Sequence, residues 1–219
     1  MNFDDTQLFA VAFEILFILI LNNLNFFEAF FLNLSFSWTF SKFAPYLIIF
    51  ILSFFGFRKI IKVISPKPLL KITLGIFIFL LPILSYFFLF PIYTGDLINA
   101  GKKVKTNFEF SERKKLVVIV LPDCPYCHES MIISKKLIER NPKLEIEYWV
   151  TGDVTDSKIE KLKSNRISII KNPEIDKTIY LTEGVFPTYA LTNNRNLEKR
   201  WTNNEFGVLA LDEIEQFFR

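Results

Sequence analysis

Cysteine and histidine are scarce in this chain, which holds two cysteines and one histidine among 219 residues. A structural zinc site usually needs four Cys or His ligands. The only cysteine and histidine residues of this sequence are Cys124, Cys127 and His128. A closed zinc site would therefore require a second chain, and we predict no metal site within this one.

Basic residues are nearly absent from the first part of the chain. Lys42 is the only one within residues 1–57, whereas charges of both signs are dense over 102–219. The formal net charge is only +3 and the basic residues are scattered among acids, so nucleic acid is not a predicted partner. The contrast predicts a transmembrane region over 1–98, a linker over 99–111 and one soluble domain over 112–219.

Long apolar runs fill the first part. A helix that crosses a bilayer needs about 20 apolar residues, because each residue rises about 1.5 Å through roughly 30 Å of hydrocarbon. The runs predict an all-α region of about three helices that contact membrane lipid. The candidate spans are 8–32, 36–57 and 72–93. Pro82 lies inside the third span, where a membrane helix tolerates a kink.

Two glutamates, Glu14 and Glu28, lie within the first candidate span. They can lie near the interfaces or face neighbouring helices, with nearby asparagines as hydrogen-bond partners. Alternatively, a buried glutamate marks a proton or partner site. The sequence leaves both interpretations open.

The loop between the second and third spans, residues 58–71, carries five basic residues and no acid. The positive-inside rule makes this loop cytoplasmic. We therefore expect a multi-pass membrane protein whose C-terminal domain is extracytoplasmic, which means periplasmic in a Gram-negative bacterium. The two aspartates near the N-terminus and the lysines after the third span run against the rule.

The soluble part predicts an α/β domain, because apolar runs of strand length alternate with helical patterns. Two strands joined by a helix form a parallel pair, and a hairpin adds antiparallel strands. We expect a less regular stretch after the second helix, up to Gly184. The predicted strands are 115–121, 144–150, 188–192 and 197–202, and the predicted helices are 125–140, 155–165 and 206–218.

Cys124 and Cys127 fall just after the first strand, at the start of its helix. A helix N-terminus has unsatisfied N–H groups and partial positive charge, which stabilise a thiolate. Pro125 suits the first helical turn because it lacks an N–H. Cys124 is then the attacking thiol, and Cys127 resolves the mixed disulfide.

Three other interpretations stay open. An inert disulfide is one, although so short a loop gains little stability from closure. A copper-delivery module would use the two cysteines, with His128 as a possible third ligand. A non-catalytic membrane scaffold would need neither thiol.

The segment CPYC after an apolar strand resembles the thioredoxin superfamily, and the tetrapeptide itself is typical of glutaredoxins. The resemblance implies a central mixed sheet flanked by helices. It also makes Pro187, in the segment EGVFPTYALT, the cis-proline opposite the cysteines. Val185 and Phe186 would then shape the surface that binds the substrate backbone.

Some residues depart from the pattern of that family. Asp123 replaces the usual Trp, and Val118 replaces the buried acid that thioredoxins place six residues before the first cysteine. Asp123 should disfavour the thiolate of Cys124, whereas protonated His128 should favour it. Pro125 and Tyr126, between the cysteines, would tune the pair further.

The resemblance implies a membrane-anchored thiol–disulfide oxidoreductase that acts on protein thiols and disulfides without a cofactor. The predicted transmembrane region has no cysteine, so it cannot relay electrons by thiol exchange. We therefore expect a separate redox partner that recharges Cys124 and Cys127.

Overall fold

The structure is a computed structural model that describes residues 24–63, 68–106, 108–122, 124–152, 166–171 and 173–219. The chain divides into two compact units, Met1–Ile92 and Tyr93–Arg219. The division falls where the composition changes from apolar to charged.

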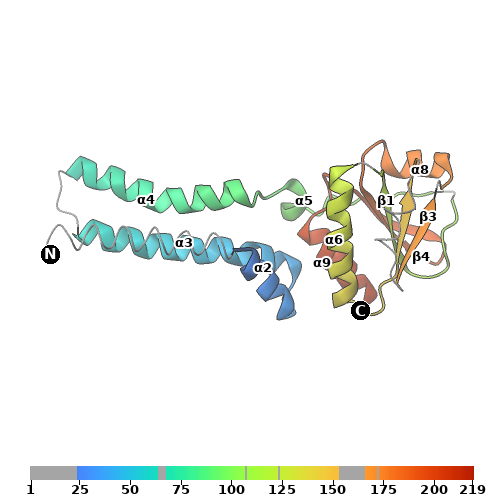
Figure 1. Cartoon of the computed structure of the whole chain (residues 1–219), viewed down its shortest axis with the longest axis horizontal. Helices are drawn as coiled ribbons and strands as arrows, with labels where there is room; N and C mark the ends of the chain where they lie inside the picture. The colour runs from blue at the N-terminus through green and yellow to red at the C-terminus, as the bar shows by residue number, and fades with distance from the viewer. Residues whose placement is uncertain (1–23, 64–67, 107, 123, 153–165, 172) are drawn as a thin grey trace. The chain divides into compact units, whose positions relative to one another are not determined.

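The first unit is helical. Its described helices are α2 (Leu24–Asn33), α3 (Trp38–Val63) and α4 (Pro68–Leu89). Ser37 caps α3, since its hydroxyl oxygen accepts a hydrogen bond of 3.2 Å from the backbone N–H of Phe40. Helices α3 and α4 run side by side (Figure 1), and α2 also packs on α3.

The described helices match the three predicted spans to different extents. Within the described part of the chain, Trp38–Arg58 is the one segment that is long and apolar enough to cross a membrane, and it matches the second span. Helix α4 covers most of the third, but its apolar stretch Gly75–Leu89 is shorter. Most of the first span, with Glu14, lies outside the described residues, whereas Glu28 is half-buried on α2.

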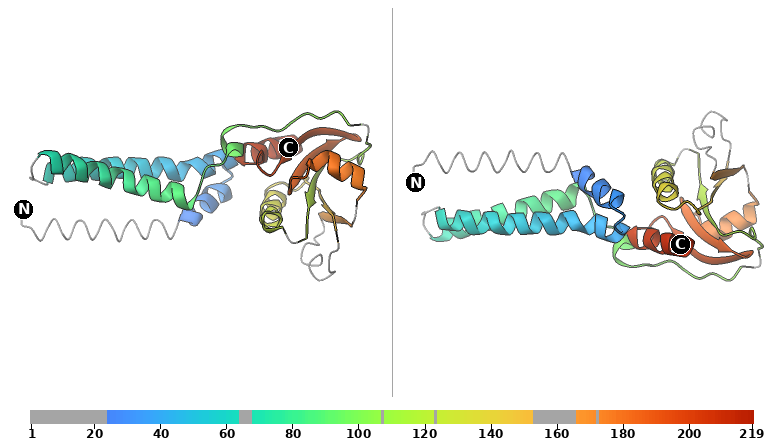
Figure 2. Two further views of the ribbon diagram at one scale, coloured as in Figure 1. Left: turned by 90° about the horizontal axis from the view of Figure 1, so that it is seen from above. Right: turned by 90° about the horizontal axis from the view of Figure 1, so that it is seen from below.

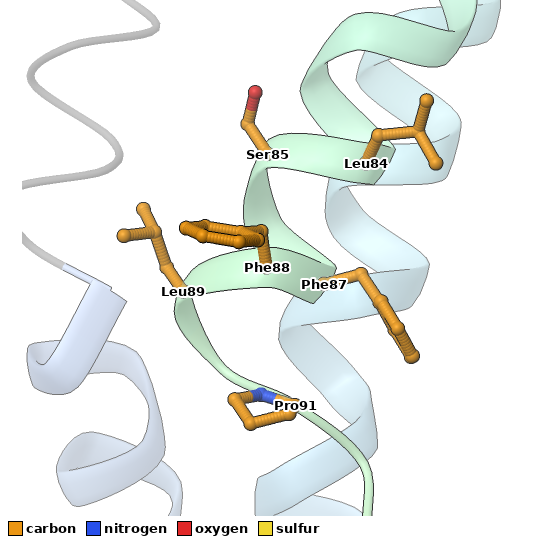
Figure 3. Close-up of a pocket in the computed structure, with 6 residues that line it drawn as sticks. All are labelled: Leu84, Ser85, Phe87, Phe88, Leu89 and Pro91. Atoms are coloured by element: carbon orange, nitrogen blue, oxygen red, sulfur yellow. The ribbon is translucent and has the colours of Figure 1, made fainter.

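The surface of α4 is strongly apolar near its C-terminal end. An open pocket there is lined by the six residues drawn in Figure 3. Phe88 is 86% exposed at this place. Exposed apolar surface of this extent fits contact with lipid or with another protein better than contact with water.

The second unit is built on a five-stranded sheet with the order β3-β2-β1-β4-β5. Strands β1, β2 and β3 pair in parallel, whereas β4 pairs antiparallel with both β1 and β5. This order and these directions are those of a thioredoxin-like fold. The bounds are Lys115–Val120 for β1, Ile146–Val150 for β2, Ile167–Lys171 for β3, Thr188–Asn193 for β4 and Asn196–Thr202 for β5.

Helices cover both faces of this sheet (Figure 2). Helix α6 (Pro125–Arg140) and helix α9 (Val208–Phe218) share one face, where Arg140 donates to Glu215 at 2.5 Å. Helix α8 (Ile175–Thr182) covers the other face, and its Leu181 packs in a core cluster with Val117 and Ile119 of β1. A short helix, α5 (Thr94–Leu97), contacts α9.

Most predicted elements of this unit are confirmed, but the expectation of a less regular stretch up to Gly184 is wrong. That stretch contains β3 and α8. Strand β3 is an edge strand with one buried residue, so it lacks the apolar run of a central strand. Helix α8 has only eight residues, too few for a clear helical period. The predicted helix 155–165 lies outside the described residues.

The predicted linker over 99–111 contacts the sheet. Lys102 forms an isolated bridge with Arg200 of β5. The Phe110 ring stacks on Trp149 of β2, with centroids 6.1 Å apart. These residues therefore belong to the second unit.

Candidate active site

The two cysteines lie at the start of α6, directly after the turn that ends β1. Cys124 is the N-cap residue with extended backbone, and Pro125 begins the helix. The backbone N–H of Cys127 donates to the Cys124 carbonyl at 3.1 Å. Both sulfurs are free thiols in this structure, with Cys124 half-buried and Cys127 buried. The geometry thus offers one accessible sulfur and one protected sulfur.

Burial sets the chemistry of the second cysteine. Cys127 is 1% exposed. Burial, and after it a hydrogen bond with Cys124, raise the pKa of its thiol from an ordinary 9.0 to about 12, although a backbone hydrogen bond with Leu121 lowers it. Cys127 is therefore a neutral thiol at pH 7 and needs help to become a nucleophile.

A loop between α8 and β4 faces the dithiol. The Phe186–Pro187 peptide bond is cis, as the sequence resemblance led us to expect. The Cys124 thiol lies 4.0 Å from the carbonyl oxygen of Phe186. Val185 and Phe186 are half-buried and Pro187 is buried. The fold thus brings the predicted docking loop and the Cys124 sulfur together.

The remaining predicted site residues lie on the surface of α6. Pro125, Tyr126 and His128 are exposed, with Tyr126 at 58%. The Tyr126 side chain is therefore accessible from solvent. Asp123 lies outside the described residues.

Sequence reasoning missed four buried hydroxyls near Cys127. Ser130 and Ser134 lie on α6, Tyr148 on β2 and Tyr189 on β4, and each is at most 2% exposed. A signal was available, because a tyrosine inside a buried strand needs a hydrogen-bond partner for its hydroxyl. What the sequence could not supply was the strand order that puts both tyrosines under one helix.

The described residues do not assemble a metal site. Within that part of the chain, no three His, Cys, Asp or Glu side chains converge on a point that could hold an ion.

No protein-family model and no curated protein matches the chain. Several solved structures are similar to about half of the chain. The thioredoxin domain of a thiol-disulfide oxidoreductase from Bacteroides vulgatus is 17% identical, with a TM-score of 0.39 over 49% of this chain and 81% of that one. A secreted disulfide oxidoreductase from Mycobacterium tuberculosis is 14% identical, with a TM-score of 0.36 over 48% and 80%.

The exposed lipoprotein thioredoxin Etrx1 from Streptococcus pneumoniae is 15% identical, with a TM-score of 0.34 over 47% of this chain and 85% of that one. Likeness at these levels carries no information on substrate or partner.

Proposed function

We propose that this protein is a membrane-anchored thiol–disulfide oxidoreductase whose active site is Cys124 and Cys127. The observation that carries the proposal is the pairing of an accessible sulfur at a helix N-terminus with a buried sulfur one turn later. Helix N–H groups stabilise the thiolate of the first cysteine. The second cysteine is protected until the first has reacted.

The reaction has two steps. The Cys124 thiolate attacks one sulfur of a client disulfide, which forms a mixed disulfide and releases the other client sulfur as a thiolate that takes up a proton. Cys127 then loses its proton and attacks the Cys124 sulfur. The Cys124–Cys127 disulfide forms, the second client thiol leaves, and the client has gained two electrons. The same steps run in reverse oxidise a client.

The substrates we propose are protein thiols and disulfides. The loop of Val185, Phe186 and Pro187 provides a backbone edge next to Cys124, and the exposed ring of Tyr126 provides apolar contact. A polypeptide can use both, whereas a small thiol can use little of either. Since the chain has only two cysteines, a separate redox partner, either another protein or a small thiol, must recharge the pair, and no cofactor is needed.

We further propose that the dithiol domain is anchored by the helical unit and lies outside the cytoplasm. The apolar stretch of α3 and the basic loop that follows it support this arrangement. In intact cells that express the full chain, a membrane-impermeant maleimide should label Cys124 in a Cys127→Ala variant. Labelling only after cell lysis would contradict the extracytoplasmic placement.

The decisive experiment traps the intermediate. The full-length Cys127→Ala variant in detergent should accumulate a mixed disulfide with an unfolded disulfide-containing protein, because the resolving sulfur is gone. The matched Cys124→Ser variant should accumulate none. If neither variant forms an adduct and the wild-type protein neither reduces nor oxidises the client, the enzymatic proposal fails. Tight Cu(I) binding by such an inactive protein would favour copper delivery.

A further inference from the structure

Strand β5 places a charged side chain in the core of the second unit. Arg200 lies on this strand and is 1% exposed. It pairs with Ala190 of β4, which in turn pairs with Val117 of β1. Residues that pair across strands point to the same face of a sheet, and Val117 belongs to the same core cluster as Leu181 of α8. The Arg200 side chain therefore enters the core on the face that α8 covers.

The main chain of Arg200 is held on both sides. Its N–H donates to the Lys102 carbonyl at 2.9 Å, and its carbonyl accepts a hydrogen bond of 2.8 Å from the Lys102 N–H. Strand β4 flanks it on the other side. The base of the side chain is therefore fixed in the sheet, and the guanidinium can hold a partner in a set place.

The C-terminal end of α8 needs hydrogen-bond donors. A helix leaves its last four carbonyls without partners of its own. The Glu183 N–H donates to the Ile179 carbonyl at 2.9 Å. The Val185 N–H donates to the Thr182 carbonyl, also at 2.9 Å. The two carbonyls that lie between Ile179 and Thr182 need donors from elsewhere in the fold.

Arg200 supplies those donors. Its Nη1 atom donates to the Leu181 carbonyl at 3.1 Å and to the Tyr180 carbonyl at 3.4 Å. Its Nη2 atom donates to the Glu183 carboxylate at 2.9 Å. Among the described residues, the Nε atom of Arg200 has no hydrogen-bond partner. A buried charge is stable only when it is paired and hydrogen-bonded, and the end of α8 provides this compensation for Arg200.

The docking loop follows directly after this end of the helix. Glu183 and Gly184 have positive φ values of 49° and 80°, and this left-handed pair turns the chain out of α8. Phe186 lies three residues after Glu183 in the sequence, with its carbonyl 4.0 Å from the Cys124 sulfur. The place of the docking loop therefore depends on where Arg200 holds the helix end.

We propose that Arg200 is a positioning residue that sets the docking loop beside Cys124 and so makes the site favour polypeptide disulfides over small ones. The inference rests on the proposed function, because it assigns a role within the same dithiol site. Arg200 acts through the end of α8 rather than on either sulfur. A polypeptide that docks on the loop needs the Phe186 backbone in a fixed place relative to Cys124, whereas a small disulfide needs only the accessible sulfur.

The test compares two disulfides with the same leaving group. One is dithiobis-nitrobenzoate, and the other is a short unstructured peptide whose cysteine carries thionitrobenzoate. In the full-length Cys127→Ala variant in detergent, Cys124 attacks either one, forms a mixed disulfide and releases one coloured thionitrobenzoate. The ratio of the peptide rate constant to the small-disulfide rate constant reports docking, because the small disulfide is an internal reference for the reactivity of the Cys124 thiolate.

In this background, Arg200→Met removes the guanidinium and keeps an unbranched side chain. The ratio should fall about tenfold, because a displaced loop no longer aligns the peptide with the sulfur. Lys199→Met is the matched control. Lys199 is the preceding residue of β5, so its side chain points to the other face, where it donates to Glu213 of α9 at 2.6 Å. The control should leave the ratio unchanged.

Hydrogen exchange shows where the chain loosens. In full-length Arg200→Met the amides of 183–186 should exchange about tenfold faster than in the wild type, because the carbonyls at the end of α8 have lost their donors. The amides of 125–140 on α6 should exchange at the wild-type rate. This contrast separates displacement of the docking loop from a general loss of stability.

A lower ratio in Arg200→Met, with an unchanged ratio in Lys199→Met, supports the inference. An unchanged ratio in Arg200→Met or an equal fall in both variants overturns it. Exchange that stays unchanged over 183–186, or that rises equally over 125–140, overturns it as well. If Arg200→Met does not fold, Glu183→Ala takes its place, because the Glu183 side chain is 59% exposed. The ratio in Glu183→Ala should fall in the same direction, and an unchanged ratio there overturns the inference.

The wild-type protein tests the proposed function separately. Its Cys127 should attack the Cys124 sulfur of the mixed disulfide and release the peptide as a free thiol. If no peptide is released, the proposed function fails and the inference fails with it. If the peptide is released while the ratio in Arg200→Met is unchanged, only the inference fails.

Discussion

The Sγ atom of Cys124 lies 4.0 Å from the carbonyl oxygen of Phe186, although 62 residues separate them in the chain. The antiparallel pairing of β1 with β4 explains the proximity. Ile119, near the end of β1, pairs with Thr188 at the start of β4. The turn after β1 and the loop before β4 therefore meet at one end of the sheet, which is where we propose that a substrate of Cys124 binds.

The two thiols should differ strongly in reactivity. In a Cys124→Ser variant, Cys127 should react with iodoacetamide at pH 7 roughly a hundredfold or more slowly than free cysteine, because its raised pKa of about 12 leaves little thiolate. In Cys127→Ala the partly exposed Cys124 should react readily. Mass spectrometry of timed samples measures both rates. Fast labelling of Cys127 in folded protein would contradict the burial described here.

Stability should fall at alkaline pH in the reduced form more than in the oxidised form. The pKa of Cys127 is higher in the folded state than in the unfolded state. The contribution of the protonated Cys127 thiol to the free energy of unfolding is therefore fully present below about pH 9 and is lost as the pH rises towards about 12. The disulfide form has no thiol to titrate. Tyr148, whose pKa is also raised to about 12, affects both forms alike.

Denaturant unfolding followed by tryptophan fluorescence at pH 8 and pH 10 measures the difference. Cys127→Ala is the control because it has no Cys127 thiol to titrate. Its free energy of unfolding should fall between pH 8 and pH 10 by the same smaller amount as that of the oxidised wild-type protein. An equal loss in the reduced and oxidised wild-type protein would contradict this assignment.

Replacing one partner of the ion pair between α6 and α9 should destabilise the fold more than replacing both partners. The side chains of Arg140 and Glu215 are 16% and 5% exposed. Arg140→Met leaves a buried carboxylate with less compensation and should lower the free energy of unfolding by about 3 kcal/mol. The double variant Arg140→Met, Glu215→Leu should lose less. A double variant less stable than Arg140→Met would show that the pair stabilises the fold outright.

Gly207 should not tolerate a side chain. A Cβ at this position would lie 2.3 Å from the Gly95 carbonyl carbon, so α5 and the start of α9 would have to separate. That separation would also strain the hydrogen bond of 3.1 Å from the Val208 N–H to Asp96. Gly207→Ala should cost about 2 kcal/mol of stability.

Gly184→Asn provides the contrast to Gly207→Ala. Gly184 has a φ of +80° and no atom within 4 Å of a Cβ placed there. Asparagine tolerates this backbone region better than most residues, so the variant should lose clearly less stability in the same denaturant series. Equal losses for the two variants would argue against the close approach of Gly95 and Gly207.

Local patterns predicted much of the second unit. The apolar run at 115–121, the Cys-Pro start of the helix at 125–140 and the turn residues between the last two strands all act through neighbours in the chain. Asn194 and Arg195 of that turn adopt positive φ, as a tight hairpin requires. Strand β3 and helix α8 were missed because their pattern is short and half exposed. These two elements are stabilised by contacts with strand β2 and with the face of the sheet. Such contacts join distant parts of the chain, so a local sequence pattern does not reveal them.

By itself the sequence determined that two cysteines one helical turn apart follow a buried strand, and that an apolar region precedes this domain. These features depend on residue type and spacing, which act over a few residues. Only the tertiary structure decided that Tyr148 and Tyr189 flank Val118 beneath Cys127, and that Gly95 meets Gly207. Strand order and helix packing bring such residues together from distant parts of the chain, because burial of apolar surface favours one arrangement of the whole sheet.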